Sequence, residues 1–396
     1  MQRVLLVLST LFALYACTPT LPHKPSEEKP AVPVGEIEAE PEQAEPITEA
    51  PEIDETPVIV DENAIPHIAL LLPLQSASFS AAARAVQQGF MAAAQLGRQE
   101  FPVRVYDSSD NNGNVVTAYR QAIANGARAV VGPLTRDEVA ALAEAQYIPV
   151  PTLSLNVVET TPAEHMYFFG MDIESEARQI AQLARQQELH EALIVTTREK
   201  LSKRLQFAFE DEWNAVGGTI LRELEFDDDL SIFADITSIS GAMIFIATDA
   251  HKARLIRPYL SNSLPVYATS RAFVGNIDTL INHDLHDINF VDMPWLLQPD
   301  HPAVMIYPRA EPPLSIDHQR LYALGIDAYR LINILLGNLL TSALPLDGVS
   351  GQIHLYGHTF QRVSTPAIFA QGQAQTGSTA VMPATQMFPE QPVSAP

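Results

Sequence analysis

Few catalytic residue types in this sequence occur at the spacings that enzymes use. The chain contains no H-E-x-x-H, G-x-S-x-G, G-x-x-x-x-G-K-[ST] or G-x-G-x-x-G segment, which are common signatures of hydrolytic and nucleotide-binding sites. One S-x-x-K segment, Ser26 to Lys29, has the spacing of penicillin-reactive serines. It lies in an acidic, proline-rich stretch that cannot preorganise an oxyanion hole, and its S-D-N and K-T-G companions are missing. We therefore expect a protein that is not an enzyme.

Two pairs of histidines are the candidates for metal chemistry. His283 and His286 flank a two-residue segment, and His354 and His358 lie near a turn expected at Gly357. No cysteine accompanies either pair, and two ligands fall short of the three or four that zinc sites use. The sequence therefore predicts solvated loop histidines, with no metal and no cofactor.

A single cysteine follows an apolar N-terminal segment. Arg3 supplies a positive charge, Val4–Leu14 is an apolar run, and Ala16 places a small residue before Cys17. This pattern is typical of a secretory signal peptide over residues 1–16, and the apolar run is too short to span a bilayer. One interpretation of Cys17 is a chance cysteine after an ordinary signal peptide.

The segment Leu14-Tyr15-Ala16-Cys17 supports another interpretation, because it resembles the lipobox of bacterial lipoproteins. The resemblance implies that Cys17 carries a lipid anchor, although Tyr15 is bulkier than the motif usually has. By the sorting rule of such lipoproteins, Thr18 in place of aspartate favours the outer membrane, with the protein on its periplasmic face. The mature chain would then have no free thiol and no disulfide.

Charge and proline content set the next stretch apart. The chain has a formal net charge of −23, and Thr18–Pro66 holds thirteen acidic residues against two lysines, together with ten prolines. Such a composition predicts a disordered, lipid-anchored tether over residues 17–65, with an extended reach on the order of 150 Å. No basic patch offsets the charge, so we expect neither a nucleic-acid partner nor an anionic membrane surface.

The elements that must position a site alternate along residues 66–370. Short apolar runs such as "HIALLLPL" and "AMIFIATD" predict buried strands, and alanine- and leucine-rich segments between them predict helices. This alternation predicts an α/β fold with two doubly wound lobes. We expect lobe 1 at 66–172 plus the helix 317–341, lobe 2 at 173–292 plus the hairpin 350–370, and a flexible tail at 371–396.

Two segments carry a resemblance to a known fold. "GARAVVGPLT…IPVPTLSLN" and "GVSGQIHLYGHTFQRV" are similar to the glycine-proline turn and the closing hairpin of type I periplasmic-binding proteins. The resemblance implies that the chain crosses between the lobes three times. It also implies an interlobe cleft, in which amino-acid-binding relatives hold the ligand carboxylate with hydroxyl groups.

The candidate cleft residues follow the expected strands, because ligands of open α/β sheets bind beyond the carboxyl ends of the strands. They are Ser76, Ser78, Thr135, Ser154, Thr196, Thr197 and Asp249. A purely structural role competes with ligand binding. Thr135 and Glu138 form a capping-box pattern, and Ser78 and Asp249 can act as N-caps.

A further resemblance concerns function. "IALLLPL", "VVGPLTRDEVAALA" and "LYALGIDAYRLI" resemble the carboxyl-terminal domain of the LpoA/LppC family, outer-membrane lipoproteins that activate a class A penicillin-binding protein. The resemblance implies that this protein binds such a peptidoglycan synthase and promotes peptidoglycan synthesis. Many members carry a helical-repeat domain before the α/β domain, whereas the acidic tether stands there in this sequence. The alternative is a lipid-anchored periplasmic solute-binding protein for amino acids or similar small polar ligands.

Overall fold

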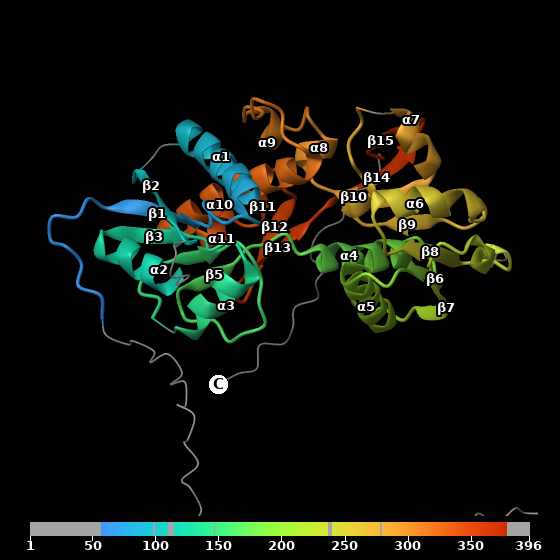
Figure 1. Ribbon diagram of the computed structural model, residues 1–396, viewed down its shortest axis with the longest axis horizontal. Helices are drawn as coiled ribbons and strands as arrows, with labels where there is room; N and C mark the ends of the chain where they lie inside the picture. Colours follow the sequence, from blue (N-terminus) through green and yellow to red (C-terminus); the bar gives the residue numbers. More distant parts are fainter. Residues whose placement is uncertain are drawn as a thin grey trace, which may run out of the picture. The chain divides into compact units, whose positions relative to one another are not determined.

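A computed structural model describes residues 57–97, 100–109, 115–145, 147–236, 240–277 and 279–377. The expected signal peptide, the lipidation site Cys17 and the expected tether up to residue 56 lie outside these residues, as does the tail from residue 378. The described part of the chain folds around two sheets of mixed α/β topology (Figure 1). No helix among the described residues is both long enough and apolar enough to cross a membrane.

The first sheet has the strand order β11-β12-β13-β5-β4-β3-β1-β2. Its strands are β1 (His67–Leu72), β2 (Val103–Asp107), β3 (Ala127–Val131), β4 (Thr152–Ser154), β5 (Met166–Phe168), β11 (Leu346–Asp347), β12 (Gln352–Tyr356) and β13 (Thr359–Val363). Strands β1 to β5 pair in parallel, and β11 to β13 form an antiparallel extension that joins β5 through the parallel pair Thr359 and Phe168.

Helices cover both faces of the first sheet. They are α1 (Ser80–Leu96) and α10 (Ile316–Leu336) on one face, and α2 (Val115–Ala124) and α3 (Arg136–Glu144) on the other, with the short α11 (Leu340–Ala343) after α10. Successive side chains of a strand point to opposite faces, so Leu70 packs under α1 and α10 while Leu71 packs under α2 and α3. Strand β1 is therefore buried throughout, as a strand covered on both faces requires.

The second sheet has the order β15-β14-β10-β9-β8-β6-β7. Its strands are β6 (Glu191–Thr196), β7 (Thr219–Glu225), β8 (Ala242–Ile246), β9 (Val266–Ala268), β10 (Ile288–Asp292), β14 (Thr365–Ala370) and β15 (Gln373–Gln375). Helices α4 (Ile173–Gln186) and α5 (Lys200–Ala215) pack on one face. The other face is covered by α6 (Ala250–Ile256) and by short 3-10 helices. These are η1 (Leu230–Phe233), η2 (Arg257–Tyr259), η3 (Ser270–Ala272) and η4 (His283–Leu285).

The chain passes between the sheets three times, as expected from the resemblance to type I periplasmic-binding proteins. The passages follow β5, β10 and β13. The second passage carries α8 (Pro294–Leu297) and α9 (Pro302–Met305) before α10, and α7 (Thr279–Asn282) precedes β10. The α/β fold with two lobes is confirmed.

Three expected boundaries need correction. The hairpin 350–370, expected in the second lobe, is divided between the sheets: β12 and β13 pair in the first sheet, and only β14 joins the second. The helix expected at 317–341 ends at Leu336, where Gly337 follows as the C-cap. Part of the expected tail, residues 373–375, forms β15 against β14.

The expected tether also ends earlier than predicted, because its last residues bond to the first lobe. The N–H of Val58 donates to the hydroxyl of Tyr147, and the N–H of Asp61 donates to the carbonyl of Ala124. Val58 and Asp61 are therefore ordered against the first lobe, although the acidic composition predicts a disordered segment there.

Candidate functional site

The candidate cleft residues of the first lobe gather at one edge of its sheet, since β4, β3 and β1 are parallel neighbours. The Thr135 hydroxyl accepts the N–H of Glu138 at 3.3 Å, and the Glu138 carboxylate accepts the N–H of Thr135 at 3.1 Å. This reciprocal capping box starts α3, so the structural role of Thr135 is confirmed. Ser154 is different, because its buried hydroxyl has no hydrogen-bond partner among the described residues.

The two serines after β1 differ from each other. Ser76 Oγ accepts the N–H of Phe79 at 3.3 Å and thereby shapes the entry to α1. Ser78 is exposed, and the N-cap of α1 is Phe79, which makes no side-chain cap. The alternative that Ser78 acts as an N-cap is therefore wrong.

The candidates of the second lobe are also engaged within their own lobe. Thr196 Oγ1 lies 2.9 Å from the Ser202 hydroxyl, and Thr197 Oγ1 accepts the N–H of Glu199 at 3.3 Å. Asp249 accepts the N–H of Lys252 at 2.9 Å and caps α6, which confirms its structural role. A ligand role for the whole set stays a prediction, and Ser154 is the buried member whose hydroxyl has no hydrogen-bond partner among the described residues.

The strongest polar site lies instead where the chain passes between the lobes. Arg320 of α10 forms a bidentate ion pair with Asp292 at the end of β10, at 3.1 and 2.6 Å, although only 6% of Arg320 is exposed. The same guanidinium donates to the carbonyls of Ser270 and Phe273 at 3.0 and 2.9 Å. A residue of a first-lobe helix thus binds two segments of the second lobe, the end of β10 and η3 with its C-cap Phe273.

Glu176 adds a second buried carboxyl group to this site. Its side chain accepts the N–H of Ser270 at 2.9 Å from the first turn of α4. Burial raises the pKa of Glu176 to about 7, with a further increase from the Asp292 carboxylate and an opposing effect of Arg362. Near neutral pH this carboxyl therefore holds a proton in a large fraction of molecules.

The remaining passages are tied by side chains in the same way. Arg362 of β13 donates to the carbonyl of Gly170 in the first passage, at 3.3 Å. In the third passage, the carboxamide of Gln179 binds both backbone groups of Ser364, with N–O distances of 2.7 and 3.0 Å. In each of the three passages, a buried polar side chain therefore forms hydrogen bonds with a residue of the passage or next to it.

Sequence reasoning missed this site, although one signal was present. Arg320 and Asp327 interrupt the apolar stripe of α10 at helical spacing with Leu324 and Leu331, so they face the interior. Asp327 is fully buried and accepts the N–H groups of Val349 and Ser350 at 3.1 and 2.7 Å. A charged residue on an apolar stripe requires a buried partner, but its partner cannot be identified from the stripe.

The histidine pairs lie apart from this site. His358 Nδ1 bonds the carbonyl of Met166 at 2.8 Å, which joins β13 to β5. His286 is exposed beside Asp287. Among the described residues, no group of three or more histidine, cysteine or acidic side chains could hold a metal ion.

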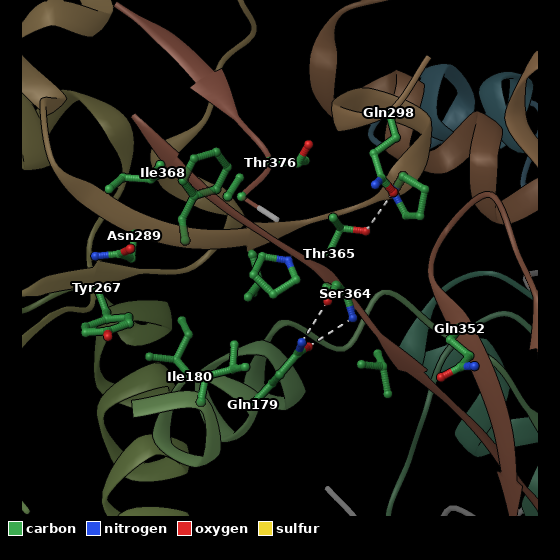
Figure 2. Close-up of a pocket in the computed structure, with 18 of the residues that line it drawn as sticks. Gln179, Ile180, Tyr267, Asn289, Gln298, Gln352, Ser364, Thr365, Ile368 and Thr376 are labelled. Carbon is green, nitrogen blue, oxygen red and sulfur yellow. Dashed lines mark hydrogen bonds between the residues drawn. The ribbon is translucent and has the colours of Figure 1, made fainter. Parts of the chain in front are cut away.

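A groove of about 470 Å³ lies beside the third passage, between α4 and β14. Figure 2 shows Gln179 reaching from α4 to Ser364, and Gln298 beside Thr365. We call it the α4–β14 groove. Its polar lining consists mainly of six carboxamide side chains, from Gln179, Gln186, Gln187, Asn289, Gln298 and Gln352. Its apolar lining includes Ile180, Leu183, Val291, Pro294, Val363, Pro366, Ala367 and Ile368.

The groove is almost free of charge. Apart from Tyr267, the titratable side chains of the lining are His301 and Asp347. The Nε2 atom of His301 lies 3.9 Å from a carboxylate oxygen of Asp347. None of the seven candidate cleft residues lines it. Thr376 and Gly377, which follow β15, form part of its wall.

Comparisons with known proteins agree with this fold. Structures of full-length LpoA and of its C-domain, both from Haemophilus influenzae, align with TM-scores of 0.68 and 0.67 at 22% and 24% identity. They cover 80% and 78% of this chain, and 60% and 99% of their own. A structure described as a putative branched-chain amino acid ABC transporter from Chromobacterium violaceum aligns with a TM-score of 0.68 at 37% identity, covering 77% of this chain and 99% of its own.

Curated relatives match over the same region. The penicillin-binding protein activator LpoA of Haemophilus influenzae is 27% identical over 281 residues, which are 68% of this chain and 48% of the relative. That of Photobacterium profundum is 23% identical over 329 residues, 72% of this chain and 53% of the relative. The chain thus spans about half the length of these relatives. The model of the LppC putative lipoprotein family matches residues 47–241 and 234–372, so the chain belongs to this family.

Proposed function

We propose that this protein is an outer-membrane lipoprotein that binds a class A penicillin-binding protein and activates it, thereby promoting peptidoglycan synthesis. The observation that carries the proposal is the family match, which covers the described α/β domain up to residue 372. Curated relatives that match the same domain are named penicillin-binding protein activators. The anchor would be a lipid on Cys17, on the periplasmic face of the outer membrane.

The mechanism requires differential binding rather than chemistry by the activator. A protein that binds the active conformation of the synthase more tightly than the inactive one shifts the synthase toward the active state. The bridged passages between the lobes suit this role, since a stiff surface loses little conformational entropy on docking. The acidic tether would supply the distance between the outer-membrane anchor and a synthase in the inner membrane.

A second candidate function is a solute-binding protein for amino acids. It is favoured by the 37% identical structure described as a putative branched-chain amino acid ABC transporter, and by the free buried hydroxyl of Ser154. Against it, Thr135, Thr197 and Asp249 already bond backbone groups of their own lobes. We therefore rank it below the activator.

The test measures the transpeptidase rate of a purified class A penicillin-binding protein with and without the chain from residue 18 to 396. Binding together with a faster rate supports the activator, and the absence of both contradicts it. Calorimetric titration of the same preparation with single amino acids tests the second candidate. The variant Arg198→Met serves as a control for surface changes, because Arg198 forms exposed ion pairs with Glu225 and Asp227.

A further inference from the structure

Backbone pairing along β14 stops inside the α4–β14 groove. Residues Ile368 to Ala370 pair with β15, in the register Ile368 to Gln375 and Ala370 to Gln373. Continuing this register would place Gly377 opposite Pro366, which has no N–H to donate. Two residues before Pro366, both backbone groups of Ser364 are already bound by Gln179. The strand partner of β14 therefore leaves the ladder at residues 376 and 377 and enters the groove wall.

The groove offers side-chain amides where the ladder ends. A carboxamide carries both donors and an acceptor, so it can bind a peptide group as a neighbouring strand does. Gln179 already does this with Ser364, and on the outer side of β15 the carboxamide of Asn276 binds both backbone groups of Ala374, at 2.8 and 3.5 Å. Among the groove carboxamides, Gln186 lies at the exposed rim and Gln352 is half-buried on the opposite wall.

The lining selects the chemistry of the occupant. An ionic ligand would find few partners, since the lining offers only the Asp347 carboxylate and the His301 imidazole beside it. Sugars commonly stack on exposed aromatic rings, whereas the tyrosine of the groove, Tyr267, is 3% exposed and donates its hydroxyl to Gln187. An extended peptide with apolar side chains and few charges matches both the amides and the apolar floor.

The segment that follows Gly377 has this composition. Residues 378–396 contain one acidic residue, Glu390, no basic residue and four prolines, together with apolar residues such as Val381 and Met382. Because the segment is joined to the groove wall, its effective concentration at the groove is on the order of millimolar, so even a weak interaction suffices.

We propose that the α4–β14 groove is a binding site for an extended peptide segment with few charges, and that its occupant is the part of this chain that follows Gly377, residues 378–396. The occupant covers the apolar floor between α4 and β14. A peptide of similar composition from another protein gains access to the groove only by displacing this segment. The proposal stands apart from the activator function, because it concerns binding within one chain.

Cross-linking within the chain tests the proposal without any synthase. The chain from residue 18 to 396 has no natural cysteine, since Cys17 is the only one in the sequence. The substitutions Gln352→Cys and Ala384→Cys place one thiol on the groove wall and one in the segment. The matched control carries the same pair together with Val381→Ser and Met382→Ser, which keep the segment length and remove apolar side chains.

We expect the disulfide to form at least ten-fold faster in the natural segment than in the control, as followed by gel mobility under a mild oxidant. A synthetic peptide of residues 378–396 in excess should slow the reaction by competition. Equal rates in the two chains, with no effect of the peptide, would overturn the proposal and leave the groove to a different occupant. Circular dichroism of each variant verifies that the fold is retained.

Discussion

At the residue scale, the passages between the lobes depend on a buried charge that is fully compensated. Arg320 pairs with Asp292, of which 1% is exposed, and it also donates to two backbone carbonyls and to the exposed carboxylate of Asp317. Because the guanidinium is planar, it meets the carboxylate with two parallel bonds, which a lysine ammonium could not reproduce. Removing one partner of such a pair leaves the charge of the other uncompensated in the interior.

The first prediction follows from this pair. The substitution Arg320→Met should lower the free energy of unfolding by about 3–5 kcal/mol, because it leaves the Asp292 carboxylate buried without its partner. The double variant Arg320→Met with Asp292→Leu should lose less free energy of unfolding than the two single variants lose together. The reason is that it buries no unpaired charge. Urea denaturation measures all three, and additive costs would contradict the coupling.

The second prediction concerns the pH dependence that Glu176 introduces. Its pKa is about 7 in the folded protein against an ordinary value of 4.5, so the folded state keeps a proton that the unfolded chain releases. The contribution is fully present below pH 4.5 and is lost as the pH rises through 7, by about 3 kcal/mol in total.

The variant Glu176→Gln imitates the protonated carboxyl at every pH. The natural chain should therefore lose stability relative to this variant between pH 5 and pH 8, as measured by urea denaturation across that range. The exposed α3 variant Glu144→Gln is the control and should keep the natural pH profile. A constant difference between the natural chain and Glu176→Gln would contradict the raised pKa.

At the element scale, helices α1 and α10 pack against each other at two glycines, Gly89 and Gly325. A methyl group added at Gly325 would lie 2.2 Å from the carbonyl oxygen of Val86, and one added at Gly89 would lie 1.9 Å from that of Tyr322. Both obstacles are backbone atoms, which cannot move aside as a flexible side chain does. The two helices therefore approach each other as closely as they do because neither position has a side chain.

The third prediction weighs this contact against helix propensity. Alanine is favoured over glycine inside a helix by about 1 kcal/mol, but overpacking typically costs about 1–3 kcal/mol and here involves backbone on the opposite helix. We expect Gly325→Ala to destabilise the protein, with a lower urea midpoint. The exposed α1 variant Gln88→Ala should leave the midpoint unchanged or slightly higher. A stabilised Gly325→Ala chain would refute the close contact.

The elements that sequence could predict are those with a local signal. The continuous apolar run at β1 indicated a strand buried on both faces, and Thr135 with Glu138 indicated the start of α3. The division of the closing hairpin between the two sheets could not be predicted, because β13 and β14 show similar alternation of buried and less buried residues. Which sheet each strand joins depends on long-range pairing, such as that of Thr359 with Phe168. The same limit hid the contact of Gln179 with Ser364, which joins residues 185 positions apart.

At the scale of the whole molecule, the three bridged passages determine how the lobes can move. Hinge closure around a solute requires a few connecting residues to absorb large backbone rotations. Here the first passage is held by Arg362 at Gly170, the second by Arg320 at Asp292, and the third by Gln179 at Ser364. Rotation of one lobe against the other would have to break the buried hydrogen bonds that Arg320 of the first lobe makes with the second, and each broken bond leaves an unsatisfied polar group.

The last prediction is that the lobes keep one arrangement whether or not amino acids are present. Fluorophores attached through Gln88→Cys on α1 and Phe207→Cys on α5, both exposed, report the distance between the lobes in the cysteine-free chain 18–396. Single-molecule energy transfer should give one narrow distribution that a mixture of amino acids does not move. Adding Arg320→Met should broaden it, because the second passage then loses its bridge. A shift of the natural chain with amino acids would instead mean that the passages act as a hinge, and the solute-binding function would replace the activator as the better proposal.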